Sequence, residues 1–411
     1  MNKYTQLSLA LLISGNLLAQ TNDNISYKTG YTNSVYYSLE DGEIATSKTT
    51  DWNLAVAIHS TQTASIIING GFGTELYQYT AGDTSDWKSL DTVGLYSSSN
   101  YKQCFDTDTS HYLSAFEYNS SGHPDYGWGM YNSITHNVIG TSLFVLKTQL
   151  GKYKKVWIVE QQAMQQTTTI KTSDLDNSNE KTLVIDRKVP NRNYLYVDIE
   201  ANTVEDLEPS NQSYDLIFTK YLGDFGTFTY PVSGVLSNIG ISVAESRGID
   251  IAEADMNANP FSKRMNVIGS DWKSFNNSSF QYDLTDSLSF FIEDKASNVW
   301  HLWFTSFEGS STGNVEFVKQ KVLSTSVSND LLESKLNVLV FPNPANETLK
   351  INLPNEKTFT VELISVTGKT IMHSENLKGK LRLDASGFDS GIYLLKVKNS
   401  EFTSIQKIVL Q

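Results

Sequence analysis

The sequence predicts an all-β protein: two tandem antiparallel β domains followed by a small C-terminal β-sandwich. Short runs in which apolar and polar residues alternate recur along the chain, and this period of two is typical of half-buried strands. No long stretch shows helical periodicity. The same order of strand motifs occurs twice in the middle of the chain, which indicates an internal repeat. A length of 411 residues fits about three domains.

The N-terminus predicts a secretory signal peptide over residues 1–19. It carries a positive charge at Lys3, a short apolar core over residues 7–13, and Ala19 just before Gln20. The apolar core is too short to cross a bilayer, and no later segment approaches 18 apolar residues. We therefore expect no transmembrane span.

Each half of the middle section opens with two strands and closes with a hairpin. The matching segments are residues 35–39, 51–56, 143–148 and 153–159 in the first half, and 194–198, 213–218, 288–292 and 299–304 in the second. We expect domains over residues 24–187 and 188–327, followed by a Ser/Asn-rich linker over residues 328–335.

The second strand of each half predicts one shared apolar face. Alternation places Trp52, Leu54 and Val56 on the same side of the first of these strands. Tyr214, Leu216 and Phe218 repeat that pattern in the second half.

Residues 336–411 predict a small antiparallel sandwich, because short alternating strands are separated by turn formers such as Pro342-Asn343-Pro344. Its motifs are Val340-Phe341-Pro342-Asn343-Pro344-Ala345, Val361-Glu362-Leu363 before Gly368-Lys369, Ser390-Gly391-Ile392-Tyr393-Leu394-Leu395-Lys396-Val397, and Lys407-Ile408-Val409-Leu410. In this order they resemble the type A C-terminal sorting domain of the type IX secretion system of Bacteroidota. The resemblance implies that the secretion machinery is a partner through residues 336–411. It also implies a secreted or outer cell-surface protein, exported by its signal peptide through the periplasm.

Composition removes several function classes. The chain has 32 Lys and Arg against 45 Asp and Glu, a net charge of −13, so we expect no nucleic-acid partner. Its one cysteine, Cys104, rules out an intramolecular disulfide and a cysteine-based zinc site, and we expect a small buried residue there.

The two halves resemble the HmuY-like family of Bacteroidota, exported all-β proteins whose founding members bind haem. In the first half the resemblance rests on residues 36–43 and 51–56, on Asn69-Gly70-Gly71, and on the hairpin with Gly151-Lys152-Tyr153. In the second it rests on residues 213–218 and 299–304 with Gly309-Ser310-Ser311-Thr312-Gly313. The family holds iron between two histidines, which implies haem as a candidate cofactor.

By position in the family pattern, His136 is the better candidate axial haem ligand and His111 the candidate partner, with His123 also available upstream. Structural or surface roles for these histidines stay open. The second half has only His301, so a two-histidine site is excluded there.

Other chemistry finds little support in the sequence. There is no His-Glu-x-x-His, no Gly-x-Ser-x-Gly and no phosphate loop. Asp106, Asp108 and Ser110, with Glu117, have some calcium-loop spacing, but His111 stands where the loop needs glycine, so we expect a solvated acidic turn and no metal site.

We therefore predict a secreted or cell-surface binding protein that is not an enzyme. The first candidate ligand is haem or a related tetrapyrrole, bound by the first domain. The alternative is a surface adhesin or glycan-binding protein without haem, because the chain is rich in aromatic residues. We expect most tryptophans to lie in strand cores rather than on the surface.

Overall fold

The computed structural model describes residues 20–97, 100–323, 338–341, 343, 345, 348–353, 357–365, 369–399 and 403–410. The predicted signal peptide over residues 1–19 and the linker over residues 328–335 lie outside this part of the chain. The chain divides into two compact units, Met1–Thr325 and Ser326–Gln411. Every helix in the described ranges is a short 3-10 helix, so the predicted all-β class is confirmed.

The first unit contains two lobes, each built from two sheets. In the first lobe, one sheet has the order β13-β12-β11-β10-β6-β7, with β8 and β9 beside β11, and the other has the order β15-β14-β4-β5. The bounds are β4 Leu54–Ala57, β5 Ile66–Ile68, η2 Gly70–Phe72, β6 Glu75–Tyr79, η3 Thr84–Lys88, β7 Tyr101–Cys104, η4 Ala115–Glu117, β8 Gly129–Tyr131, β9 Val138–Gly140, β10 Phe144–Lys147, β11 Tyr153–Gln162, β12 Thr167–Asp174, β13 Lys181–Asp186, β14 Tyr194–Asp198 and β15 Thr203–Glu205.

The second lobe has one sheet of order β1-β23-β22-β21-β18, a second of order β17-β16-β2-β3, and the hairpin β19-β20. The bounds are β1 Gln20–Ser26, η1 Thr29–Tyr31, β2 Asn33–Ser38, β3 Gly42–Lys48, β16 Leu216–Asp224, β17 Thr229–Ser237, β18 Ser242–Arg247, η5 Ile251–Glu253, β19 Lys273–Asn276, β20 Gln281–Leu284, β21 Leu288–Glu293, β22 Val299–Phe307, η6 Gly309–Ser311 and β23 Asn314–Leu323.

Each lobe buries its own apolar core between its two sheets. In the first lobe Leu54 and Val56 of one sheet pack with Phe144 of the other. In the second lobe Phe218 faces Phe290 in the same way. The apolar residues that alternate along these predicted strands therefore fill the two cores.

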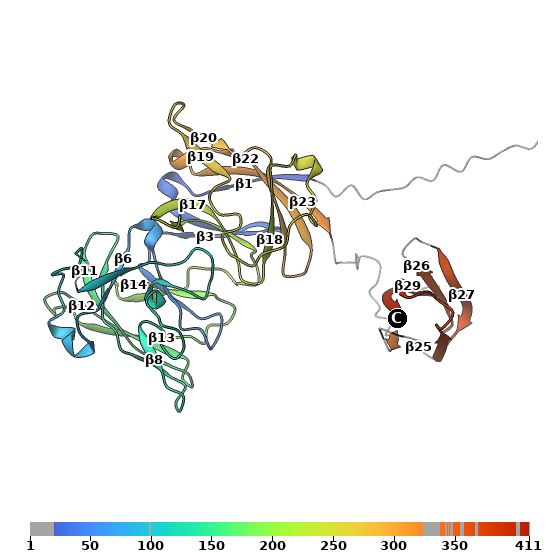
Figure 1. The fold of residues 1–411 in the computed structure, drawn as a ribbon, viewed down its shortest axis with the longest axis horizontal. Helices are drawn as coiled ribbons and strands as arrows, with labels where there is room; N and C mark the ends of the chain where they lie inside the picture. Colours follow the sequence, from blue (N-terminus) through green and yellow to red (C-terminus); the bar gives the residue numbers. More distant parts are fainter. Residues whose placement is uncertain are drawn as a thin grey trace, which may run out of the picture. The chain divides into compact units, whose positions relative to one another are not determined.

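The N-terminal strands of each half cross into the lobe of the other half. β2 pairs with β16, with Tyr37 opposite Leu216, and β14 pairs with β4, with Val197 opposite Leu54. Figure 1 shows the result, with the blue strands β1 and β3 among the yellow and orange strands of the second lobe. The predicted boundary between residues 187 and 188 thus does not separate the sheets. Strand pairing across the halves depends on contacts between distant residues, which the local sequence pattern cannot predict.

The exchanged segments make equivalent hydrogen bonds in the two lobes. The Asn53 side chain accepts from the N–H of Ile199 at 2.9 Å, and Asp215 accepts from the N–H of Leu39 at 2.8 Å. The buried Asn193 then links the lobes, because its amide donates to Asn238 at 2.8 Å. The two halves therefore share a local structure as well as a motif order.

The predicted face of the second strand is wrong at its first residue in both halves. Leu54 and Val56 lie in the first core, but Trp52 packs on the opposite side, with its ring 5.1 Å from that of Tyr196. Tyr214 likewise leaves the face of Leu216 and packs against Tyr36 at 5.0 Å. Both residues precede the first paired position of their strands, so strand alternation does not extend to them.

The second unit is a two-sheet β-sandwich, as predicted. One sheet has the order β24-β25-β28 and the other β27-β26-β29-β30. Leu349, Val361 and Leu395 are fully buried in its core. The bounds are β24 Leu339–Phe341, β25 Thr348–Asn352, β26 Phe359–Ser365, β27 Thr370–Leu377, β28 Lys380–Asp384, β29 Gly391–Lys398 and β30 Thr403–Leu410.

Candidate functional site

The structure gives the two predicted haem ligands separate surroundings. His136 is exposed in the turn between β8 and β9, with a positive φ of 61° and its Nδ1 2.6 Å from the Tyr131 hydroxyl. His111 lies against the second lobe, with its Nε2 2.9 Å from the Ser237 carbonyl oxygen. Because a carbonyl only accepts, this contact places a proton on Nε2. Burial lowers the pKa of His111, so the ring is neutral.

An open groove of about 820 Å³ lies between residues 105–122 of the first lobe and the tip of the β16–β17 hairpin. Leu113 and Tyr118 line it from the first lobe and Phe228 from the second, and each is at least 55% exposed. Phe225 stacks on Phe228 with ring centroids 5.4 Å apart. We call this feature the aromatic groove.

Two carboxyl groups line the aromatic groove beside η4. Asp106 accepts from the N–H groups of Ile68 at 2.9 Å and Ala115 at 2.7 Å, and Glu117 accepts from the Ser114 hydroxyl at 3.0 Å. Burial raises the pKa of each to about 7, and these donors partly oppose the rise. The prediction of a solvated acidic turn is therefore wrong for Asp106 and Glu117, because these side chains are partly buried and hydrogen-bonded at the junction of the lobes.

A second hollow, the inter-lobe cavity, has a volume of about 140 Å³ and is largely apolar. Three carboxyl residues line it, Asp106, Asp108 and Glu208. Glu208 accepts from the Tyr194 N–H at 2.7 Å, the Asn193 N–H and the Tyr214 hydroxyl. Burial raises the pKa of Glu208 to about 7. The aromatic residues of the wall are Tyr36, Trp52, Tyr194, Tyr196, Tyr214 and Tyr221.

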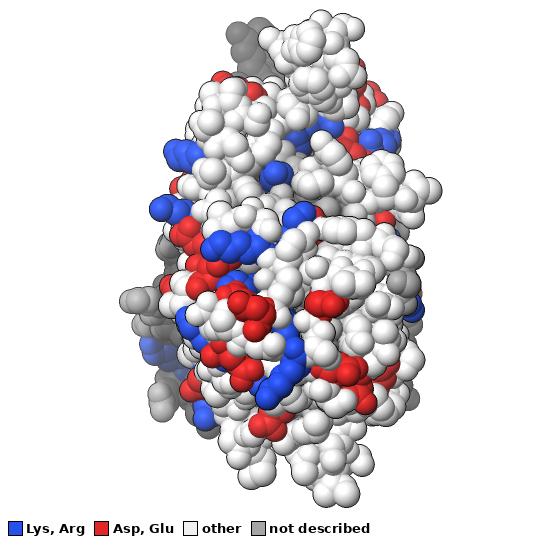
Figure 2. Space-filling view, turned by 90° about the vertical axis from the view of Figure 1, so that its left-hand side faces the viewer, with Lys and Arg blue, Asp and Glu red and all other residues white. Residues whose placement is uncertain are grey.

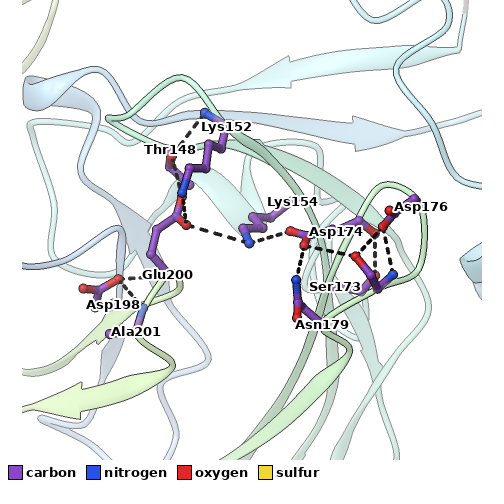
Figure 3. Close-up of polar contacts among 11 residues, drawn as sticks. Thr148, Lys152, Lys154, Ser173, Asp174, Asp176, Asn179, Asp198, Glu200 and Ala201 are labelled. Atoms are coloured by element: carbon purple, nitrogen blue, oxygen red, sulfur yellow. Dashed lines mark hydrogen bonds and ion pairs between the residues drawn. The ribbon is translucent and has the colours of Figure 1, made fainter.

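A cluster of lysines and carboxylates shown in Figure 3 fastens an exchanged segment. Glu200, in the turn after β14, lies 3.1 Å from Lys152 and 3.8 Å from Lys154 and accepts from the Thr148 hydroxyl. Lys154 also pairs with Asp174 at 2.5 Å. Each of these carboxylates has a cation beside it, so the cluster is a structural element rather than a free binding site.

Charge is similarly interspersed elsewhere. On the face drawn in Figure 2, Lys and Arg side chains lie next to Asp and Glu side chains, with broad uncharged areas between them. No helix in the described part of the chain is long and apolar enough to span a membrane.

Most tryptophans fill cores, as predicted: Trp128 and Trp272 are at most 1% exposed, and Trp87 and Trp300 are nearly as buried. Cys104 is also buried, and burial raises its thiol pKa to about 12. The exposed rings of the aromatic groove are Tyr and Phe. The abundance of tryptophan in the sequence therefore does not help to locate the groove. The spacing of Asp106 and Glu117 is the one local signal that marks the groove.

The comparisons with known proteins identify the second unit. Residues 339–411 match the secretion system C-terminal sorting domain family. The chain therefore carries a type IX sorting domain and is an exported protein of the cell surface or exterior.

For the rest of the chain the comparisons are weak. Among curated proteins, none matches. One similar solved structure is PorZ, described as an essential bacterial surface component of the type IX secretion system of Porphyromonas gingivalis. It has 9% sequence identity and a TM-score of 0.17, and the match covers 68% of this chain but only 44% of that chain. A likeness this weak carries no argument about function.

Proposed function

We propose that this protein is a non-enzymatic binding protein that is delivered outside the cell and holds a glycan in the aromatic groove. The observation that carries the proposal is the pairing of exposed rings on both walls of one groove with carboxyl groups between them. Export places such a groove where surface and extracellular glycans are found.

The groove offers the two kinds of contact that a sugar needs. Tyr118 and Phe228 are exposed aromatic rings, and the C–H face of a sugar ring packs against such rings. Glu117 and Asp224 offer carboxyl oxygen atoms that accept hydrogen bonds from sugar hydroxyl groups. A groove with a few polar groups among apolar walls is the general form of a small-ligand site.

The surroundings of the carboxyl groups favour binding over hydrolysis. Both oxygens of Asp106 already accept backbone N–H groups, and Glu117 is held by Ser114. Glycoside hydrolysis needs two carboxyl groups whose oxygens both reach the glycosidic bond, and Asp106 has no oxygen without a backbone donor. We therefore expect bound oligosaccharides to be recovered intact. Release of reducing ends during incubation with the protein would contradict this expectation.

A glycan array probed with the full exported chain tests the proposal. We expect a restricted set of oligosaccharides to bind and Phe228→Ala to lose at least ten-fold in signal, because one wall of the groove is removed. Phe280→Ala is the matched control, since Phe280 is a 79% exposed ring outside the groove. An array without signal, or equal signal for Phe228→Ala, would contradict the proposal.

Haem capture, implied by the resemblance to the HmuY-like family, stays the alternative. It requires His136 and His111 to reach one iron, and His111 would have to give up its contact with Ser237. A haemin titration of the full chain tests it. A Soret shift that His136→Ala weakens supports haem, and an unchanged spectrum in that variant excludes His136 as a ligand.

A further inference from the structure

We propose that the inter-lobe cavity is a second binding site, which takes a small organic ammonium ion held by Asp108. This site goes beyond the proposed glycan function, because Asp108 lines the cavity and is not among the residues that line the aromatic groove.

The first argument is the state of the Asp108 side chain. Asp108 is only 8% exposed, and its Oδ1 has no hydrogen-bond partner among the described residues. Its Oδ2 has one distant contact, the N–H of Asp224 at 3.5 Å. A buried acceptor without a donor is costly, and the cost is relieved when a ligand supplies the donor.

The second argument is the aromatic wall. Ile217, Thr219 and Tyr221 alternate along β16 and line the cavity from the second lobe, while Tyr194 and Tyr196 line it from the first. A cavity lined by a carboxylate and by tyrosine rings has the chemistry that recognises an ammonium group, through an ion pair and through attraction to the ring electrons.

The third argument is that the protein does not supply this cation itself. Lys220 also lines the cavity, but its Nζ lies over the Phe72 ring, 4.8 Å from the ring centre, and no ion pair joins it to Asp108 among the described residues. His111, which also lines the cavity, bonds the Ser237 carbonyl. Among the described ion pairs, none includes Asp108, so the ammonium group has to come from a ligand.

Volume limits the ligand to one ring or a short chain. The cavity measures about 140 Å³. A cavity of roughly 150 Å³ with apolar walls holds one benzene molecule. The ligand class is therefore a primary amine with a single ring or a short alkyl chain, far smaller than a tetrapyrrole.

Calorimetric titration of the full chain at pH 7.5 with benzylamine and with benzyl alcohol tests this site. The two probes have nearly the same shape, and only the amine is charged. We expect benzylamine to bind at least ten-fold more tightly than benzyl alcohol. Equal affinities, or no binding of benzylamine at millimolar concentration, would overturn the proposal without any variant.

A matched pair of variants locates the site. Asp108→Asn should bring the affinity for benzylamine down to that for benzyl alcohol and leave the alcohol unchanged. Asp286→Asn, at an exposed position outside the cavity, should bind both probes as the wild type does. Tight benzylamine binding that survives in Asp108→Asn would show that the amine binds elsewhere. The glycan array is read separately, so failure of this site and failure of the glycan proposal are distinguishable.

Discussion

At the scale of single residues, the junction between the lobes depends on buried titratable side chains. Asp106, Glu117 and Glu208 are carboxyl groups whose pKa burial raises to about 7. His59 is a half-buried imidazole whose pKa burial lowers to about 4. Such groups are neutral or nearly so at the pH where most carboxylates are charged, which lets them lie between two packed lobes.

Glu208 should make stability fall as pH rises. Its folded pKa of about 7 lies above the ordinary value of 4.5, so the folded state holds the proton more tightly. The stabilisation is complete below pH 4.5 and is lost as pH rises to about 7. Over this window the wild type should lose ~3 kcal/mol of unfolding free energy relative to Glu208→Gln, at 1.36 kcal/mol per pKa unit.

Urea unfolding at several pH values between 4 and 8 measures this difference. Glu316→Gln is the control, because Glu316 is exposed on β23. A wild-type stability that tracks Glu208→Gln at every pH would contradict the burial argument.

Sequence reasoning reached part of the site at this scale. The spacing of Asp106, Asp108 and Glu117 marked an acidic segment. In the structure these three residues line the aromatic groove or the inter-lobe cavity, and they are buried or partly buried rather than solvated. What the sequence lacked was the partner surface: the hairpin tip at Phe228 lies more than 100 residues away in the chain. The His59 ring likewise packs against a residue distant in sequence, with its centre 5.2 Å from that of the Tyr112 ring.

At the scale of elements, the lobes meet where η2 packs on β16. A Cβ atom added at Gly71 would lie 2.4 Å from the Lys220 carbonyl oxygen. Because this oxygen belongs to the backbone, a change of side-chain rotamer cannot remove the clash. At the adjacent Gly70, the nearest atom to an added Cβ is 3.4 Å away, an ordinary contact. The glycine pair predicted in the family motif therefore has one position that needs glycine for close approach.

Gly71→Ala should destabilise the protein by about 1–3 kcal/mol, the usual cost of overpacking. Gly70→Ala is the matched neighbour and should change stability by less than ~1 kcal/mol. Thermal unfolding of both variants measures the contrast. Equal melting temperatures would show that η2 does not press on β16 as described.

Strand identity was more predictable than strand pairing. The alternating segments that became β4, β10, β11, β16 and β21 follow from local pattern, because each must bury one face. The exchange of β2 and β14 does not follow from it. It becomes visible only in the pairing of residues far apart in the chain, such as Tyr37 opposite Leu216.

At the scale of the whole molecule, the exchanged strands should make the two lobes unfold together. Leu54→Ala removes buried apolar volume from the first core and should cost ~2–5 kcal/mol. Because β14 completes the first lobe and β2 the second, we expect amides of β22 to exchange hydrogen faster along with those of β11. Faster exchange confined to the first lobe would contradict this coupling.

Passage from the periplasm to the cell surface should depend on the second unit. A chain that ends at Thr325 lacks the sorting domain but keeps both lobes intact. We expect it to stay inside the cell envelope, in the periplasm, while the full chain reaches the surface or medium. Cell fractionation followed by immunoblotting measures this, and normal release of the shortened chain would contradict the role of residues 339–411.

The central claim is that residues of both lobes contact one glycan ligand bound in the aromatic groove. Titration of an array-selected oligosaccharide into the wild type, Tyr118→Ala, Phe228→Ala and the double variant tests it most directly. Each single change should weaken binding at least ten-fold, since either one removes a wall contributed by a different lobe. An unchanged Kd in either single variant would contradict a ligand held between the two lobes.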